Sequence, residues 1–119
     1  MKVEQLPLAR QVEIVFSEIK EELKVLNSGT LFLQIRNNVI GKFGIKHIPI
    51  EGKGGELQSQ STGLTEPHFQ SFIQMALQSL QYKKWTHGEI LFDFRIKQNT
   101  LHASVQFESN YNLANLSKT

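Results

Sequence analysis

Residues 88–107 read GEILFDFRIKQNTLHASVQF, and this stretch decides the fold. Apolar side chains occupy the even positions of 90–96 and the odd positions of 101–107. Such alternation is typical of β-strands that bury one face. An antiparallel hairpin that pairs Ile96 with Leu101 brings both apolar sets to the same face. We therefore expect a hairpin in this register.

The same register has consequences for the turn and for the polar face of the hairpin. It closes through residues 98–99 as a two-residue turn, and an asparagine tolerates the left-handed backbone that such turns need. On the outward face it sets Arg95 opposite His102 and Asp93 opposite Ser104.

An earlier segment, residues 31–45, shows a similar alternation. A two-residue turn at 37–38 would set Leu33 beside Lys42, which disagrees with the apolar pattern. We therefore expect a bulged turn of about three residues over 37–39. The shared apolar face then consists of Leu31, Leu33, Ile35, Phe43 and Ile45.

A helix precedes each hairpin. Apolar residues recur at spacings of three and four over residues 5–26, and Gly29 follows as a stop signal. The second helix begins after Thr65 as N-cap, has Pro67 in its first turn and ends near Tyr82. Both helices have one apolar face that must be buried.

The element order is therefore αββαββ, and the fold class is α+β. We expect a four-stranded antiparallel sheet with two helices packed on one face. Residues 1–108 form a single domain and residues 109–119 a polar C-terminal tail. The sequence leaves open whether the two αββ halves arose by duplication or converged on one pattern. Residues 51–63, with four glycines, predict a mobile surface connection, either functional or disordered.

Composition excludes several kinds of chemistry. The chain has 119 residues and a net charge of +2. Because it contains no cysteine, disulfides, thiolate zinc sites and cysteine nucleophiles are ruled out. Residues 52–55 (GKGG) lack the order of a phosphate-binding loop. The histidines have no spacing of three or four, so we expect no metal site and no cofactor. We expect two of them, His68 and His102, to lie at the surface.

The segment near the N-terminus carries acidic residues among its apolar ones, unlike a signal peptide. No apolar run approaches the roughly 18 residues of a membrane span. We therefore expect a cytoplasmic protein that does not enter a membrane.

The outward face of the sheet offers two candidate functions. An aromatic among cations is typical of sheets that bind single-stranded nucleic acid. The candidate residues are Phe32, Arg36, Lys42, Arg95 and His102. A hydrolytic enzyme could instead use Asp93, Ser104 and His102 as acid, hydroxyl and base. An open sheet provides no oxyanion hole and does not exclude water, which argues against the enzyme.

A third candidate function is protein binding. The polar face of the second helix has no charge between Glu66 and Lys83, as interface cores often do. The candidate interface residues are Gln70, Gln74, Gln78 and Met75. The strand 101–107 also has no lysine to protect it if it lies at an edge. We expect a homodimeric binding or regulatory domain that acts through protein contacts, with an unknown protein partner or a small ligand.

Overall fold

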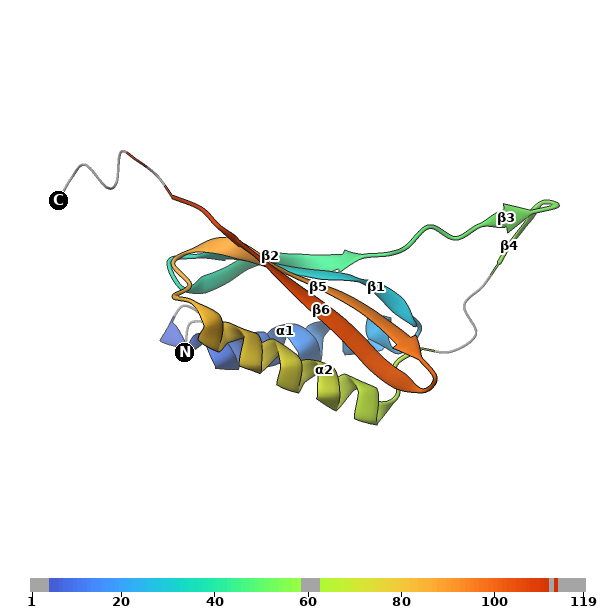
Figure 1. Ribbon diagram of the computed structural model, residues 1–119, viewed down its shortest axis with the longest axis horizontal. Coiled ribbons are helices and arrows are strands. Elements are labelled where there is room, and N and C mark those ends of the chain that lie inside the picture. The colour runs from blue at the N-terminus through green and yellow to red at the C-terminus, as the bar shows by residue number, and fades with distance from the viewer. Residues whose placement is uncertain (1–4, 59–62, 112, 114–119) are drawn as a thin grey trace.

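The computed structural model describes residues 5–58, 63–111 and 113 (Figure 1). The order αββαββ is confirmed, with a short additional hairpin between the two halves. The elements are α1 (Leu8–Leu23), β1 (Ser28–Arg36), β2 (Val39–Lys46), β3 (Gly52–Lys53), β4 (Glu56–Leu57), α2 (Glu66–Ser79), the 3-10 turn η2 (Leu80–Tyr82), β5 (His87–Lys97) and β6 (Thr100–Ser109).

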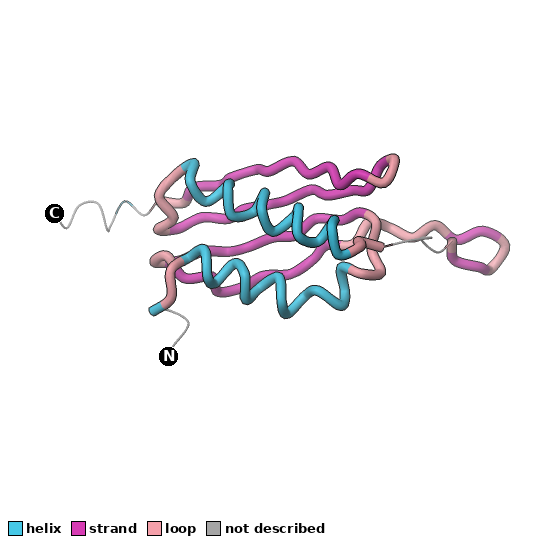
Figure 2. The backbone as a smooth tube through the Cα atoms, turned by 90° about the horizontal axis from the view of Figure 1, so that it is seen from below, coloured by secondary structure: helices cyan, strands magenta, loops and turns pink. Residues whose placement is uncertain are grey.

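The main sheet has the strand order β2-β1-β5-β6, and all three strand pairs are antiparallel. Both helices cover the same face of this sheet, as Figures 1 and 2 show, so the α+β class and the single helical layer are confirmed. Helix α1 contacts β2 and α2 contacts β6. Strands β2 and β6 are therefore the two edges, and each has a helix beneath it.

The hairpin β5–β6 has the register expected from the sequence. Ile96 pairs with Leu101, and the pairing continues without a shift to the end of β6. The turn consists of Gln98 and Asn99, with φ angles of 52° and 62°. Both residues adopt the left-handed backbone conformation, and a turn of this kind fits the right-handed twist of the flanking strands.

The hairpin β1–β2 corrects one expectation. Leu33 pairs with Phe43 as expected, but the turn has two residues, Asn37 and Asn38, and not three. The extra residue lies within β2, where the register shifts opposite Gln34. Both asparagines adopt positive φ, which suits a two-residue turn, and the β-bulge restores the apolar register beyond it.

The core lies between the sheet and the helices and is rich in aromatic rings. Phe16 of α1, Phe72 of α2 and Phe92 of β5 are fully buried. The rings of Phe16 and Phe72 meet edge to face with centroids 5.0 Å apart, and those of Phe72 and Phe92 do so at 5.8 Å. Such pairs add roughly 0.5–1.5 kcal/mol beyond their area burial. These contacts fix both helices on the sheet.

Gln11 is a buried polar residue that the sequence did not reveal. It is 1% exposed on α1. Its side-chain oxygen accepts a hydrogen bond from the amide of Ile40, and its nitrogen donates to the carbonyls of Leu6 and Asn38. Gln11 thereby attaches the β1–β2 turn to the first turn of α1.

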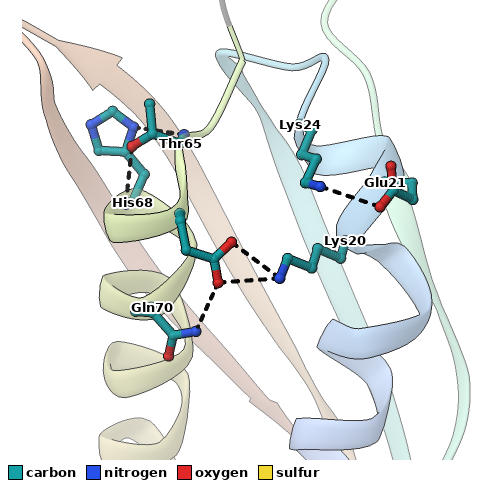
Figure 3. Close-up of polar contacts among 7 residues, drawn as sticks. Lys20, Glu21, Lys24, Thr65, His68 and Gln70 are labelled. Carbon is teal, nitrogen blue, oxygen red and sulfur yellow. Dashed lines mark hydrogen bonds and ion pairs between the residues drawn. The ribbon is translucent and has the colours of Figure 1, made fainter.

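His68 was expected at the surface, but the side chain is 8% exposed. Its Nδ1 accepts a hydrogen bond from the amide of Thr65 (Figure 3). Its Nε2 donates to the carbonyl of Asn99 at 2.9 Å. The ring completes the N-terminal cap of α2 and ties it to the β5–β6 turn. Ser79, near the end of α2, is also buried and donates to the carbonyl of Ala76.

The two helices also meet through an exposed polar contact. Lys20 of α1 forms an ion pair with Glu66 of α2, to which Gln70 donates a further hydrogen bond (Figure 3). The bonds from Lys20 and Gln70 hold the pKa of Glu66 below its usual value. Gln70 is therefore directed toward the α1 side of α2.

The connection between the halves contains the hairpin β3–β4, where an irregular segment was expected. Gly54 and Gly55 form its tip with φ angles of 64° and 85°. The hairpin projects beyond the main sheet (Figures 1 and 2) and is exposed throughout. Residues 59–62 of this connection lie outside the described residues, and its mobility stays a prediction.

Candidate functional site

The outer face of the sheet, opposite the helices, does not bring the five candidate residues together. Arg36 pairs with His87 at one end of β5, whereas Arg95 lies at its other end and pairs with His102. At about 3.4 Å per residue, the two ends are roughly 25 Å apart. Two separate groups of side chains result.

The first group surrounds an open hollow of about 530 Å³ beside the bulge of β2. Arg36 and Lys42 line it together with the acidic Glu89 and Glu108, which are cross-strand neighbours. Gln34 donates a hydrogen bond to Glu89 at 3.0 Å. The carboxylates offset the two cations, so the hollow is not a simple anion site.

Phe32, the single aromatic candidate, already has contacts within the chain. Its ring lies over Gly44, where an added Cβ would come within 2.9 Å of the ring. The Lys46 ammonium lies 5.8 Å from the ring centroid. Phe32 therefore covers a glycine on the neighbouring strand, which is a structural reason for an aromatic at this position.

The second group contains the residues of the hydrolase alternative. Asp93, His102 and Ser104 line a shallow hollow at the β5–β6 side of the face. Asp93 accepts a hydrogen bond from Thr30. In the described part of the chain, no hydrogen bond joins Ser104 to His102. The three side chains share a face, but they do not form a nucleophile with an oriented base.

The edge strand β6 offers a different kind of site, namely its backbone. Asn110 donates a hydrogen bond to the carbonyl of His87, directly after β6 ends. In an antiparallel pair, successive residues direct their backbone groups to opposite sides of the strand. The amide and carbonyl of every second residue back from Asn110 therefore also point toward β5. Ile96 correspondingly donates to Asn27, on the other side of β5. The remaining β6 residues point their amides and carbonyls away from the sheet: Leu101, Ala103, Val105, Phe107 and Ser109.

The two edges of the sheet differ in how they are protected. The β2 edge has a bulge, and the exposed Lys42 and Lys46 lie along it. Bulges and lysines are devices that discourage further strand pairing. The β6 edge runs regularly for its whole length without bulge, lysine or proline. No other described strand pairs with its outward side.

One flank of α2 runs beside this edge. The Tyr82 ring lies 6.1 Å from that of Phe107, and Ser71 shares a hollow with Leu101. Side chains three and four residues apart share a helix flank. The flank continues from α2 into η2, which contains Tyr82. We define the β6-edge surface as the outward backbone of β6 together with this flank, whose side chains are Ser71, Met75, Gln78 and Tyr82.

The β6-edge surface includes some of the interface residues expected from the sequence. Met75 and Gln78 belong to it, whereas Gln70 is directed toward α1 through its bond to Glu66. Gln74 is exposed on the side of α2 away from the sheet. Tyr82 is 77% exposed and Val105 37%, so the surface has apolar area in contact with solvent.

Among residues 5–58, 63–111 and 113, no group of three or more acidic or histidine side chains could hold a metal ion. Within those same ranges, no helix has the length and apolar character needed to cross a membrane. Comparison of the chain with models of protein families, with curated proteins and with solved structures gave no match.

Proposed function

We propose that this protein is a small protein-binding domain that self-associates through the β6-edge surface. The observation that carries the proposal is the unprotected β6 edge, with a regular row of outward amides and carbonyls. A strand added to such an edge gains backbone hydrogen bonds, each contributing about 0.5–1.5 kcal/mol net. The regulatory role and the cytoplasmic location expected from the sequence are part of this proposal.

The flank of α2 supports the same surface. Interface centres are depleted in charge and enriched in aromatic residues and methionine. The flank carries Met75 and Tyr82, and α2 has no charge between Glu66 and Lys83. The edge and the flank lie on the same side of the molecule. The edge supplies backbone pairing, and the flank supplies side-chain contacts.

Light scattering over a hundredfold range of concentration tests the proposal, with Ala103→Pro as the informative variant. The amide of Ala103 points away from β5, so proline removes a bond available to a partner and none within the sheet. We expect the unmodified protein to dimerise and the folded variant to be monomeric. Ser104→Pro is the matched control, because its lost amide faces β5 and its fold should weaken. A monomer at every concentration, or a dimer indifferent to Ala103→Pro, contradicts the proposal.

A second candidate function is binding of single-stranded nucleic acid at the hollow beside the bulge. It is favoured by Arg36 and Lys42, which line the same hollow with His87. Glu89 and Glu108 in that hollow oppose it, because they repel phosphate. Protein binding is therefore the better supported function.

A further inference from the structure

We infer that two copies of this chain join their sheets by antiparallel pairing of β6 with β6, centred on Val105. This inference rests on the proposed function, and it names the partner and the register of that same surface. In this register Val105 lies opposite the partner's Val105 on a two-fold axis. The two four-stranded sheets then become one continuous sheet with all helices on one face.

The direction of the backbone groups limits the allowed registers. Outward backbone groups of one β6 strand must face outward groups of the other. The odd-numbered residues of one copy, such as Ala103 and Val105, therefore pair with odd-numbered residues of the other copy. Their side chains all lie on the helical face of the sheet, as the burial of their β5 partners Phe94 and Phe92 shows. Every allowed register therefore brings the helices of both copies to one side.

Hydrogen-bond complementarity selects one of these registers. Within residues 100–109 the two ionisable side chains are His102 and Glu108, and both are on the outer face. Pairing centred on Val105 sets His102 opposite the partner's Glu108, and symmetry repeats this contact. No other allowed register pairs these two residues. An imidazole N–H donates a hydrogen bond to a carboxylate, and the contact becomes an ion pair when the ring is protonated.

Side-chain size favours the same register. The large Phe107 lies opposite the partner's Ala103, so a bulky ring meets a small side chain at two symmetric places. A register centred on Ser104 would instead set His102 opposite the partner's Gln106 and Glu108 opposite the partner's Thr100. That arrangement does not pair His102 with a carboxylate.

The helix flanks complete the contact below the strands. Paired strands lie about 4.8 Å apart and packed helices about 8–10 Å apart, so pairing of β6 brings the two α2 helices close to each other. Met75 and Gln78 of each copy then face the axis. Because this flank has no charge, the two copies do not repel one another there.

Disulfide formation tests the register directly, since the chain contains no cysteine. Residues paired at the axis have Cα atoms about 5.5 Å apart, within the range a disulfide spans. We expect Val105→Cys to form covalent dimers under mild oxidation. Ser104→Cys, the matched control, should not do so, because it lies opposite the partner's Gln106.

The outcomes separate this inference from the proposed function. Cross-linking of Ser104→Cys in place of Val105→Cys overturns the register and leaves the β6 pairing intact. Absence of both cross-links in a dimer that Ala103→Pro dissociates also overturns the register alone. Absence of both in a protein that is monomeric by light scattering overturns the proposed function as well.

Substitution of the two paired side chains provides an independent test. His102→Glu sets two carboxylates opposite each other at two places, and we expect the dimer Kd to rise roughly two- to thirtyfold. Within one chain the new carboxylate faces Arg95, so the monomer keeps its stability. Adding Glu108→Lys should return the Kd to within about threefold of the original value. A double variant as weak as the single one overturns the pairing of His102 with the partner's Glu108.

Discussion

The amide of Asn110 donates a hydrogen bond to the carbonyl oxygen of His87 over 3.1 Å, and this contact determines the chemistry of the β6 edge. It assigns the even-numbered residues of β6 to the bonds with β5 and leaves the odd-numbered ones to solvent or a partner. Ser104 and Ala103 are neighbours in sequence, yet one amide maintains the sheet and the other is available for binding.

The α2 flank gives a matched pair of variants. Gln78→Glu places a carboxylate near its symmetry mate, and we expect the dimer Kd to rise about tenfold because buried like charges repel. Gln74→Glu adds the same charge on the side of α2 away from the sheet and should leave the Kd within about twofold. Analytical ultracentrifugation measures both. Equal effects of the two variants on the dimer Kd would contradict the placement of this flank in the dimer interface.

Gly88 is predicted to be essential for pairing of β5 with β6. A Cβ at this position would lie 2.2 Å from the carbonyl oxygen of Glu108, which is backbone and cannot rotate away. We expect Gly88→Ala to lower the free energy of unfolding by roughly 1–3 kcal/mol. Gly41→Ala is the control, because a Cβ there meets nothing within 4 Å. Urea denaturation measures both, and equal stabilities would contradict the packing described for Gly88.

Gln11 is predicted to stabilise the fold through its three hydrogen bonds. Gln11→Met keeps the volume of the side chain but leaves the amide of Ile40 and two carbonyls without their partner. We expect a loss of roughly 1–3 kcal/mol, measured by thermal or urea denaturation. Arg10→Met, at an exposed neighbouring position, should change stability by less than about 1 kcal/mol. An unchanged free energy of unfolding in Gln11→Met would show that these three hydrogen bonds contribute nothing to stability.

Nucleic-acid binding is tested by fluorescence anisotropy with a labelled single-stranded oligonucleotide. We expect no binding at micromolar protein, because Glu89 and Glu108 lie beside the cations of the hollow. The result that would establish the second candidate function is affinity that falls steeply with salt and is weakened by Arg36→Gln or Lys42→Gln. Arg95→Gln should then have a smaller effect, since Arg95 lies at the other end of the sheet.

The sequence predicted the fold class and the β5–β6 register because the alternation of apolar residues and the two-residue turn agree there. It failed at the β1–β2 turn, where a bulge within β2 reconciles a two-residue turn with the apolar register. Alternation reports only which face a residue is on, and a bulge changes the register without changing the apolar set. A bulge was expected from the sequence, but it was placed in the turn, whereas the extra residue lies within β2 beyond Asn37 and Asn38.

The burial of these polar side chains could not be predicted from the sequence pattern, for a related reason. Gln11 and His68 are buried because backbone groups of distant turns require hydrogen bonds, and those turns meet the helices only in the folded chain. The direction of the β6 amides, by contrast, was accessible from the sequence. A two-residue turn at Gln98 and Asn99 makes its flanking pair hydrogen-bonded, and that assignment extends along the whole strand.

Amide hydrogen exchange along β6, followed by NMR on the unmodified protein, tests self-association through this edge most directly. We expect the outward amides of Ala103, Val105 and Phe107 to exchange as slowly as those of Ser104 and Gln106 when the protein is dimeric, and to lose protection on dilution. Protection that alternates along β6 at concentrations where the protein is dimeric would contradict pairing through this edge.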